Sequence, residues 1–170
     1  MAFTPKELFS RPNYTPSELR MLAGVNPKKE SIVYSANCLC GGVRFQILCE
    51  LEPIQVCHCS QCRKAQGGAF ATNTPVKESA FQLDSGAELL RSFEASAGKQ
   101  RVFCSECGSP IYSKTNAVPD VLRIRAGLIN EPVSVRLAAH FYTGSKASWW
   151  SINDNLPQFE GAYAPRKTKA

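Results

Sequence analysis

Seven of the eight cysteines in this 170-residue chain fall into short, regularly spaced groups, and such groups are typical of metal sites. One group has two separated halves, Cys38-Leu39-Cys40 and Cys104-Ser105-Glu106-Cys107, and each half is followed by glycine. Two sulfurs at a tight turn bind one metal ion, and glycine relieves strain where the chain reverses. The halves together supply four thiolates, the number that a closed tetrahedral zinc requires. We therefore predict a structural zinc on Cys38, Cys40, Cys104 and Cys107.

The other group is Cys57-His58-Cys59-Ser60-Gln61-Cys62-Arg63-Lys64. Cys57 and Cys59 are two residues apart, so on an extended segment they point the same way. Cys62 falls at the start of a predicted helix, whose positive end favours a thiolate. His58 should point to the opposite face, and we interpret it as an orienting or structural residue before a ligand. Three sulfurs without a clear fourth ligand are typical of a catalytic zinc with an open position.

The ligand set also indicates the kind of reaction. Three thiolates leave zinc a weak Lewis acid that is poorly suited to activating water, and they favour a soft fourth ligand such as a substrate thiol. A free thiol has a pKa of about 8.5 and is mostly protonated at neutral pH, whereas a metal-bound thiol is deprotonated. The sequence therefore favours thiol chemistry over hydrolysis.

The segments around these cysteines read mainly as β-strands. Apolar residues at every second position predict a strand over Val43–Cys49, with Cys49 on the apolar face as a small core residue. Glycines and prolines separate the other candidates. These are Leu51–His58, Ala69–Val76, Glu88–Phe93, Lys99–Cys104, Pro110–Lys114, Val121–Ala126 and Val133–Tyr142. Only Ser60–Gln66 looks helical here, with Ser60 as the expected N-cap, so we predict a mainly β domain.

The N-terminal 30 residues have a different pattern. Thr4-Pro5-Lys6-Glu7 and Thr15-Pro16-Ser17-Glu18 each combine a capping box with proline at the first helical position. They predict two short helices that pack on the domain. The expected organisation is a helical extension over residues 1–30, a zinc-binding domain over 31–163 and a basic tail over 164–170.

Composition and charge exclude several classes of protein. A hydrophobic content of 44% supports one sizeable core. A membrane helix needs about 20 consecutive apolar residues, and no apolar run of the chain approaches that length. The N-terminus does not show a signal-peptide pattern, so we expect the reducing cytoplasm. The net charge of +6 comprises +2 in residues 1–30, +3 in residues 164–170 and +1 between them. We interpret the basicity as solvated ends and expect no nucleic-acid partner.

Several motifs together resemble one family. They are C-x-C-G-G-x-V-R-F from Cys38, C-H-C-S-x-C-R-K from Cys57, F-C-x-x-C-G-S-P from Phe103 and G-S-K-A-x-W from Gly144. The order and spacing of these motifs resemble the glutathione-dependent formaldehyde-activating family, together with the related centromere protein V-like proteins. The resemblance spans about residues 31–163.

The resemblance implies a mainly β, zinc-binding fold of the Mss4-like type with two zinc ions per chain. Cys38, Cys40, Cys104 and Cys107 match the family's structural ligands, and Cys57, Cys59 and Cys62 match its catalytic ligands. The implied activity is that of a carbon–sulfur lyase, which joins formaldehyde to glutathione as S-hydroxymethylglutathione.

Other residues are assigned from their position near these motifs. His58 or Lys64 would protonate the developing alkoxide, and Arg63, Lys64 and Lys146 would attract the carboxylates of glutathione. Each of these cations is alternatively a solvated surface charge. Trp149 and Trp150 are expected in the core or the pocket wall, with packing favoured, and His140 has no assigned place.

Two other functions stay open. One is a non-catalytic zinc module that binds protein or nucleic acid, and the other is a thiol redox or metal-sensing role for Cys57, Cys59 and Cys62. The sequence leaves the true aldehyde, the thiol and the oligomeric state undetermined.

Overall fold

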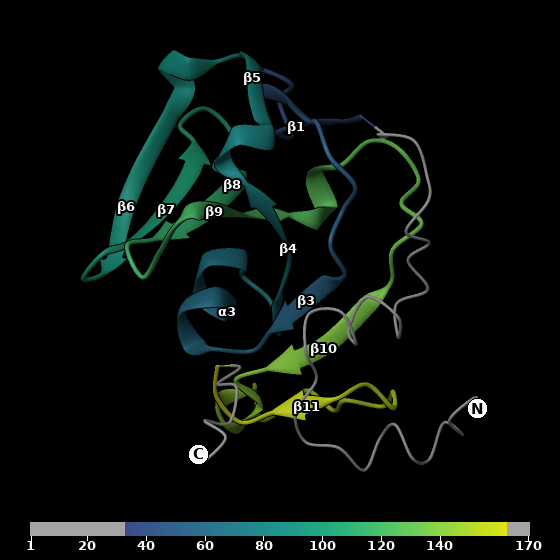
Figure 1. The fold of residues 1–170 in the computed structure, drawn as a ribbon. Helices are drawn as coiled ribbons and strands as arrows, with labels where there is room; N and C mark the ends of the chain where they lie inside the picture. Colours follow the sequence, from purple (N-terminus) through teal and green to yellow (C-terminus); the bar gives the residue numbers. More distant parts are fainter. Residues whose placement is uncertain (1–32, 163–170) are drawn as a thin grey trace, which may run out of the picture.

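The computed structural model describes residues 33–162, which form two β-sheets and one short α-helix (Figure 1). The smaller sheet has three strands in the order β1-β2-β5, and the larger has eight in the order β11-β10-β3-β4-β9-β8-β7-β6. In chain order the strands are β1 (Tyr34–Asn37), β2 (Arg44–Ile47), β3 (Ile54–Cys57), β4 (Ala71–Lys77), β5 (Phe81–Ser85), β6 (Leu90–Ser96), β7 (Lys99–Cys104), β8 (Pro110–Thr115), β9 (Val118–Arg125), β10 (Leu137–Phe141) and β11 (Gln158–Phe159). The prediction of a mainly β domain is confirmed.

The apolar core lies between the two sheets. Alternation along β2 turns Phe45 and Ile47 inward, and both are fully buried. On the larger sheet, Leu122 and Ile124 of β9 face the same core. Other members of this cluster are Tyr34, Ala36, Cys38, Val43, Leu51, Ile54, Val76, Cys104, Ile111 and Val135. The same alternation directs the odd-numbered residues of β9 to the opposite face of the larger sheet.

That opposite face is partly covered by α3 (Ser60–Gln66), which connects β3 to β4, is drawn beside β3 and below β9 in Figure 1, and contacts Arg101 of β7. The helix ends at Gly67, which adopts the left-handed conformation with φ 64°. Four single 3-10 turns complete the elements: η1 (Glu78–Ala80), η2 (Ala87–Leu89), η3 (Ala126–Leu128) and η4 (Thr143–Ser145).

The bounds of α3 and of β7 agree with the predicted ranges, whereas the predicted N-cap is wrong. Cys59, not Ser60, caps the helix, and its Sγ accepts a hydrogen bond from the Cys62 N–H at 3.3 Å. Cys59 has the extended backbone conformation of an N-cap residue, with φ −61° and ψ 151°.

Several strand predictions also needed correction. β9 begins at Val118 and includes Pro119, which the sequence reading treated as a separator. Pro119 is tolerated because the pairing of β9 with β4 starts only at Val121, so its missing N–H leaves no ladder bond unmade there. The sequence reading also missed β5, although Phe81 and Leu83 alternate with polar residues as in any half-buried strand. The predicted N-terminal helices lie outside the described residues.

Among the helices within residues 33–162, none is long and apolar enough to cross a membrane.

A close backbone contact joins the turn before η2 to the turn between β1 and β2. Gly86 has φ 82°, and a Cβ there would lie 2.5 Å from the Gly42 carbonyl oxygen. We expect Gly86→Ala to lower the free energy of unfolding by about 2 kcal/mol or more, because both the backbone angle and the contact are incompatible with a side chain. Urea unfolding would measure this. Gly127→Ala is the matched control, because a Cβ there meets nothing within 4 Å, and an equal loss in both variants would contradict the prediction.

Candidate functional site

Two hairpin turns bring together the four cysteines of the predicted structural zinc site. Cys38 and Cys40 lie in the turn between β1 and β2, and Cys104 and Cys107 lie in the turn between β7 and β8. Their four Sγ atoms all lie within 4.8 Å of one another. The Cys38–Cys40 and Cys40–Cys104 sulfur distances are 3.4 Å and 3.9 Å. These values are close to the about 3.8 Å between ligands of a tetrahedral zinc–thiolate centre.

The backbone of both turns directs the cysteine sulfurs toward one another. Gly41 and Gly108 have φ 74° and 72°, the left-handed conformation that glycine adopts without strain. The Val43 N–H donates to the Cys38 Sγ at 3.2 Å. Burial of the Cys38 thiol opposes its ionisation, but this hydrogen bond and those with neighbouring sulfurs bring its pKa below the ordinary value. Across the turns, the Leu39 N–H donates to the Ser109 Oγ at 3.0 Å, which ties one hairpin to the other.

The second cluster consists of Cys57 at the end of β3, Cys59 at the N-cap of α3 and Cys62 in its first turn. The three Sγ atoms lie within 4.8 Å of one another, and no fourth histidine, cysteine or carboxylate of residues 33–162 completes the group. Cys62 is buried, whereas Cys57 and Cys59 are half-buried. The structure thus brings together the seven predicted cysteines as one set of four and one open set of three.

The pKa values of the three thiols differ because their sulfurs lie so close together. Hydrogen bonds from Cys57 and Cys59, followed by the Arg101 guanidinium, lower the pKa of Cys62 to about 2, despite its burial. The same interactions with Cys59 and Cys62 raise the pKa of Cys57. Arg101 Nη2 lies 3.7 Å from Cys62 Sγ and donates to Gln61 Oε1 at 3.3 Å. The cluster therefore favours at least one thiolate, held beside a buried cation.

His58 points away from the sulfurs, as predicted, and belongs to a buried hydrogen-bonded chain. Its Nε2 lies 2.8 Å from Nδ1 of His140, and Nε2 of His140 lies 3.0 Å from a carboxylate oxygen of Asp154. Burial, followed by the neighbouring His140, lowers the pKa of His58, so the ring is neutral at pH 7. The sequence reading left His140 without a place, because the residues that pair here are 82 positions apart.

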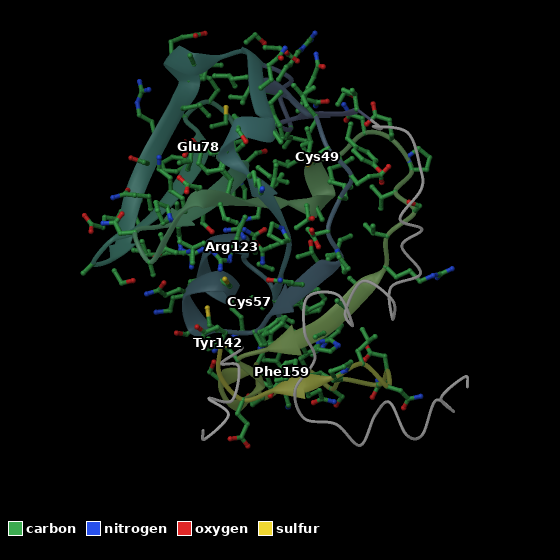
Figure 2. The ribbon with its side chains drawn as sticks, viewed as in Figure 1. Cys49, Cys57, Glu78, Arg123, Tyr142 and Phe159 are labelled. Carbon is green, nitrogen blue, oxygen red and sulfur yellow. The ribbon has the colours of Figure 1, made fainter. Side chains whose placement is uncertain are left out.

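Tyr142 is a further residue near the three-cysteine cluster that sequence reasoning missed. It follows β10, whose Phe141 pairs with Cys57, and it has φ 58°, the only positive φ of a non-glycine residue in the described part of the chain. Burial, then the sulfurs of Cys57 and Cys59, raise the pKa of its hydroxyl. Figure 2 draws Cys57 between Arg123 and Tyr142. A strained backbone beside a reactive cluster is frequent at functional sites.

The predicted substrate-binding residues are less well placed than the cysteines. Lys64 is exposed on α3, and Lys146 is exposed with its Nζ on the Trp150 carbonyl at 3.1 Å. Arg63 is half-buried and, like Lys146, contributes to lowering the pKa of His58. Trp149 is 70% exposed, so it does not lie in the core, whereas its place in a pocket wall stays a prediction. Its ring instead packs edge-on against Trp150, with ring centroids 6.4 Å apart.

Comparison with known proteins agrees with this arrangement. The family model described as glutathione-dependent formaldehyde-activating enzyme matches residues 33–145, which contain both cysteine clusters. Over 79 residues the chain is 27% identical to an uncharacterized lyase of Schizosaccharomyces pombe, covering 46% of this chain and 56% of that protein. Over 78 residues it is 28% identical to an Emericella nidulans protein named, provisionally, as a glutathione-dependent formaldehyde-activating enzyme. That match covers 46% of this chain and 40% of the relative.

The aligned region thus spans about half the length of these relatives. A crystal structure of a Rhodobacter sphaeroides protein is also similar, with a TM-score of 0.48 and 21% identity, covering 58% of this chain and 89% of that one.

The buried histidine pair generates a stability prediction. We expect His140→Phe to lower the free energy of unfolding by about 1–3 kcal/mol, because it leaves Nε2 of the fully buried His58 without a partner. Asp154→Asn should cost less, because the Asp154 side chain is 45% exposed and water can replace it. Urea unfolding of both variants compares the two losses. A greater loss of unfolding free energy in Asp154→Asn than in His140→Phe would contradict the prediction that the His58–His140 hydrogen bond contributes most of the stability.

Proposed function

Because the chain belongs to the glutathione-dependent formaldehyde-activating family, we propose that it is a zinc-dependent carbon–sulfur lyase. Its substrate would be the adduct of glutathione, or a similar thiol, with formaldehyde or a related small aldehyde. The observation that carries the proposal is the contrast between the two clusters, one with four sulfurs and the other with three. Four sulfurs complete the coordination of a structural zinc ion, whereas three sulfurs leave one coordination position for a substrate sulfur.

The residues present fit two zinc ions. Cys38, Cys40, Cys104 and Cys107 would hold the structural ion, since their sulfur separations suit tetrahedral coordination. Cys57, Cys59 and Cys62 would hold the second ion, which when bound keeps a substrate thiol deprotonated at neutral pH. Sulfur-only ligand sets favour zinc over magnesium or calcium, which prefer oxygen.

The reaction needs a thiol sulfur beside an aldehyde carbon and a proton for the oxygen. The sulfur attacks the carbonyl carbon, a C–S bond forms, the C=O π bond breaks, and the oxygen takes one proton to give the hydroxymethyl thioether. Holding both reactants together contributes several kcal/mol to such a step. In this chain, Arg101 would stabilise negative charge at Cys62 Sγ, which lies 3.7 Å from its Nη2.

Tyr142 joins His58 and Lys64 as a candidate proton donor. The Tyr142 hydroxyl keeps its proton at neutral pH because burial and the nearby sulfurs raise its pKa. The ring of His58 is directed to His140 behind the strand, so we assign to His58 the orientation of the segment that carries Cys57 and Cys59. Lys64 is exposed and free to reach bound substrate.

The proposed activity can be measured by NMR in the zinc-loaded protein, with glutathione and ¹³C-formaldehyde. The adduct forms spontaneously, so the readout is the rate of magnetisation exchange between hydrated formaldehyde and the S–CH₂–OH carbon. We expect the protein to increase this rate, and the same assay with other aldehydes and thiols identifies the preferred pair. An exchange rate unchanged for every pair would refute the lyase proposal.

Replacement of a structural ligand should be destabilising. We expect Cys107→Ser to reduce zinc and to lower the free energy of unfolding by about 3 kcal/mol or more, because metal-binding energy is folding energy at such a site. Metal analysis and thermal unfolding test this. Cys49→Ser is the matched control, because Cys49 is a partly buried cysteine outside both clusters. A zinc-replete, stable Cys107→Ser protein would overturn the structural assignment.

Replacement of an open-site ligand should affect activity more than folding. We expect Cys59→Ser to reduce zinc from about two to about one per chain and to abolish accelerated exchange. Its thermal midpoint should change little, because serine is itself a favoured N-cap for α3 and the lost metal closes only a local loop. If Cys59→Ser unfolds as severely as Cys107→Ser, the second cluster is structural as well.

A further inference from the structure

Four basic side chains share the face of the larger sheet that α3 covers. Lys99 and Arg101 are two residues apart on β7, and Arg123 and Arg125 are two apart on β9, so each pair points to one side. Strand register joins the pairs, because Arg101 lies opposite Ser113 of β8 and Ser113 lies opposite Arg123. We call Lys99, Arg101, Arg123 and Arg125 the basic row.

The basic row lies next to the three-cysteine cluster. Asn73 of β4 lies opposite Arg125 and also opposite Gln55 of β3, two residues before Cys57 on the same face. Arg101 contacts Cys62 directly, at 3.7 Å between Nη2 and Sγ. Figure 2 shows Arg123 and Cys57 in the same region of the molecule. The row and the sulfurs therefore lie side by side on one face of the larger sheet.

The cations of this row lack acidic partners. Arg125 is 4% exposed and Arg101 is 9% exposed. The side-chain ion pairs of residues 33–162 are Lys114–Glu78 and His140–Asp154, and neither includes a member of the row. A buried charge needs a counter-charge, and apart from the sulfurs this face offers the row no carboxylate partner among residues 33–162.

Several donors in the row also lack hydrogen-bond acceptors. Arg101 Nη1, Arg123 Nη1 and Arg125 Nε are buried and make no hydrogen bond. The Lys99 ammonium is close enough to its neighbours that burial, followed by the charges of Arg123 and Arg101, lowers its pKa to about 8. Unused donors and mutual repulsion are both relieved by one ligand that accepts several hydrogen bonds and carries negative charge.

The cysteine cluster alone does not balance this charge. Three thiolates with one divalent ion carry a net charge of −1, whereas Arg101, Arg123 and Arg125 carry +3 before Lys99 is counted. Arg101 already faces Cys62, and Arg125 interacts electrostatically with the three sulfurs, which leaves Arg123 for another anion. Planar guanidinium groups bind carboxylates with two parallel hydrogen bonds, which suits an organic acid.

We propose that the basic row binds a carboxylate of the thiol substrate and so directs its sulfur to Cys57, Cys59 and Cys62. The identity of the ligand as a thiol rests on the proposed function, whereas its carboxylate is inferred from the row itself. The row, rather than Arg63, Lys64 and Lys146, would then select substrates by charge. Thiols without a carboxylate would bind weakly.

The first test uses the unaltered, zinc-loaded chain and ligands without a free thiol. S-methylglutathione carries both carboxylates of glutathione, and its diethyl ester carries none. We expect the ester to have a Kd at least about tenfold higher in an NMR titration, the effect of losing a charge-assisted hydrogen-bonded pair. Equal Kd values for the acid and the ester would overturn the proposal. This comparison requires no variant and no lyase activity.

The second test removes one cation. Arg123 is half-buried and its Nη1 makes no hydrogen bond, so Arg123→Gln is the chosen variant. It should raise the Kd of S-methylglutathione at least about tenfold and leave that of its diethyl ester unchanged. Arg136→Gln, which removes an exposed charge before the start of β10, is the matched control and should leave both Kd values unchanged. An equal effect in both variants would show a general charge effect and would overturn the proposal.

The source of the carboxylate is tested by competition. Glyoxylate is an aldehyde with its own carboxylate, and we expect it to compete poorly with S-methylglutathione. Tighter binding of glyoxylate, lost in Arg123→Gln, would assign the row to the aldehyde and overturn the proposal. Binding of S-methylglutathione that depends on Arg123, in a protein that does not accelerate adduct exchange, would support the row and refute only the lyase function.

Discussion

The contact between two hairpin turns is the constraint on which the rest of this structure depends. The turn between β1 and β2 belongs to the smaller sheet and the turn between β7 and β8 to the larger one, and together they bring four sulfurs within 4.8 Å. The apolar side chains of the smaller sheet are buried in the core that it shares with the larger one, so the smaller sheet depends on this junction. Gly86 and Gly42 pack backbone to backbone beside this junction, which leaves no space for a side chain.

The larger sheet has two faces with separate roles, and alternation along its strands creates both. On β9, Leu122 and Ile124 enter the apolar core, whereas Arg123 and Arg125 enter the region of the three sulfurs. Stability and chemistry are therefore carried by neighbouring residues of one strand. A one-residue slip of its register would exchange the two faces, so the packing of the core also fixes the position of the cations.

Alternation acts in the same way within the segment Cys57–Cys59. The two sulfurs leave one side of the strand, and the His58 ring leaves the other, where it meets His140. The imidazole pair thereby anchors the segment from behind while the sulfurs stay accessible. Cys59 contributes twice, because its Sγ both faces the cluster and caps α3. The position of Cys62 follows from that cap, since it fixes the first turn of the helix.

The sequence by itself determined the features that depend on local spacing. The membership of the three-cysteine cluster, the range of α3 and the mainly β class follow from residues a few positions apart, whose relative directions are set by backbone geometry. The four-cysteine cluster joins two such half-sites 64 residues apart, and the sequence predicted it because a closed tetrahedral zinc needs four ligands. Only the tertiary structure decided the partners of His58 and the assembly of the basic row. His140 is 82 residues from His58. The basic row combines residues of two strands, and the net charge of +1 over residues 31–163 does not reveal that they gather on one face. Such contacts depend on strand order and register, which local patterns do not specify.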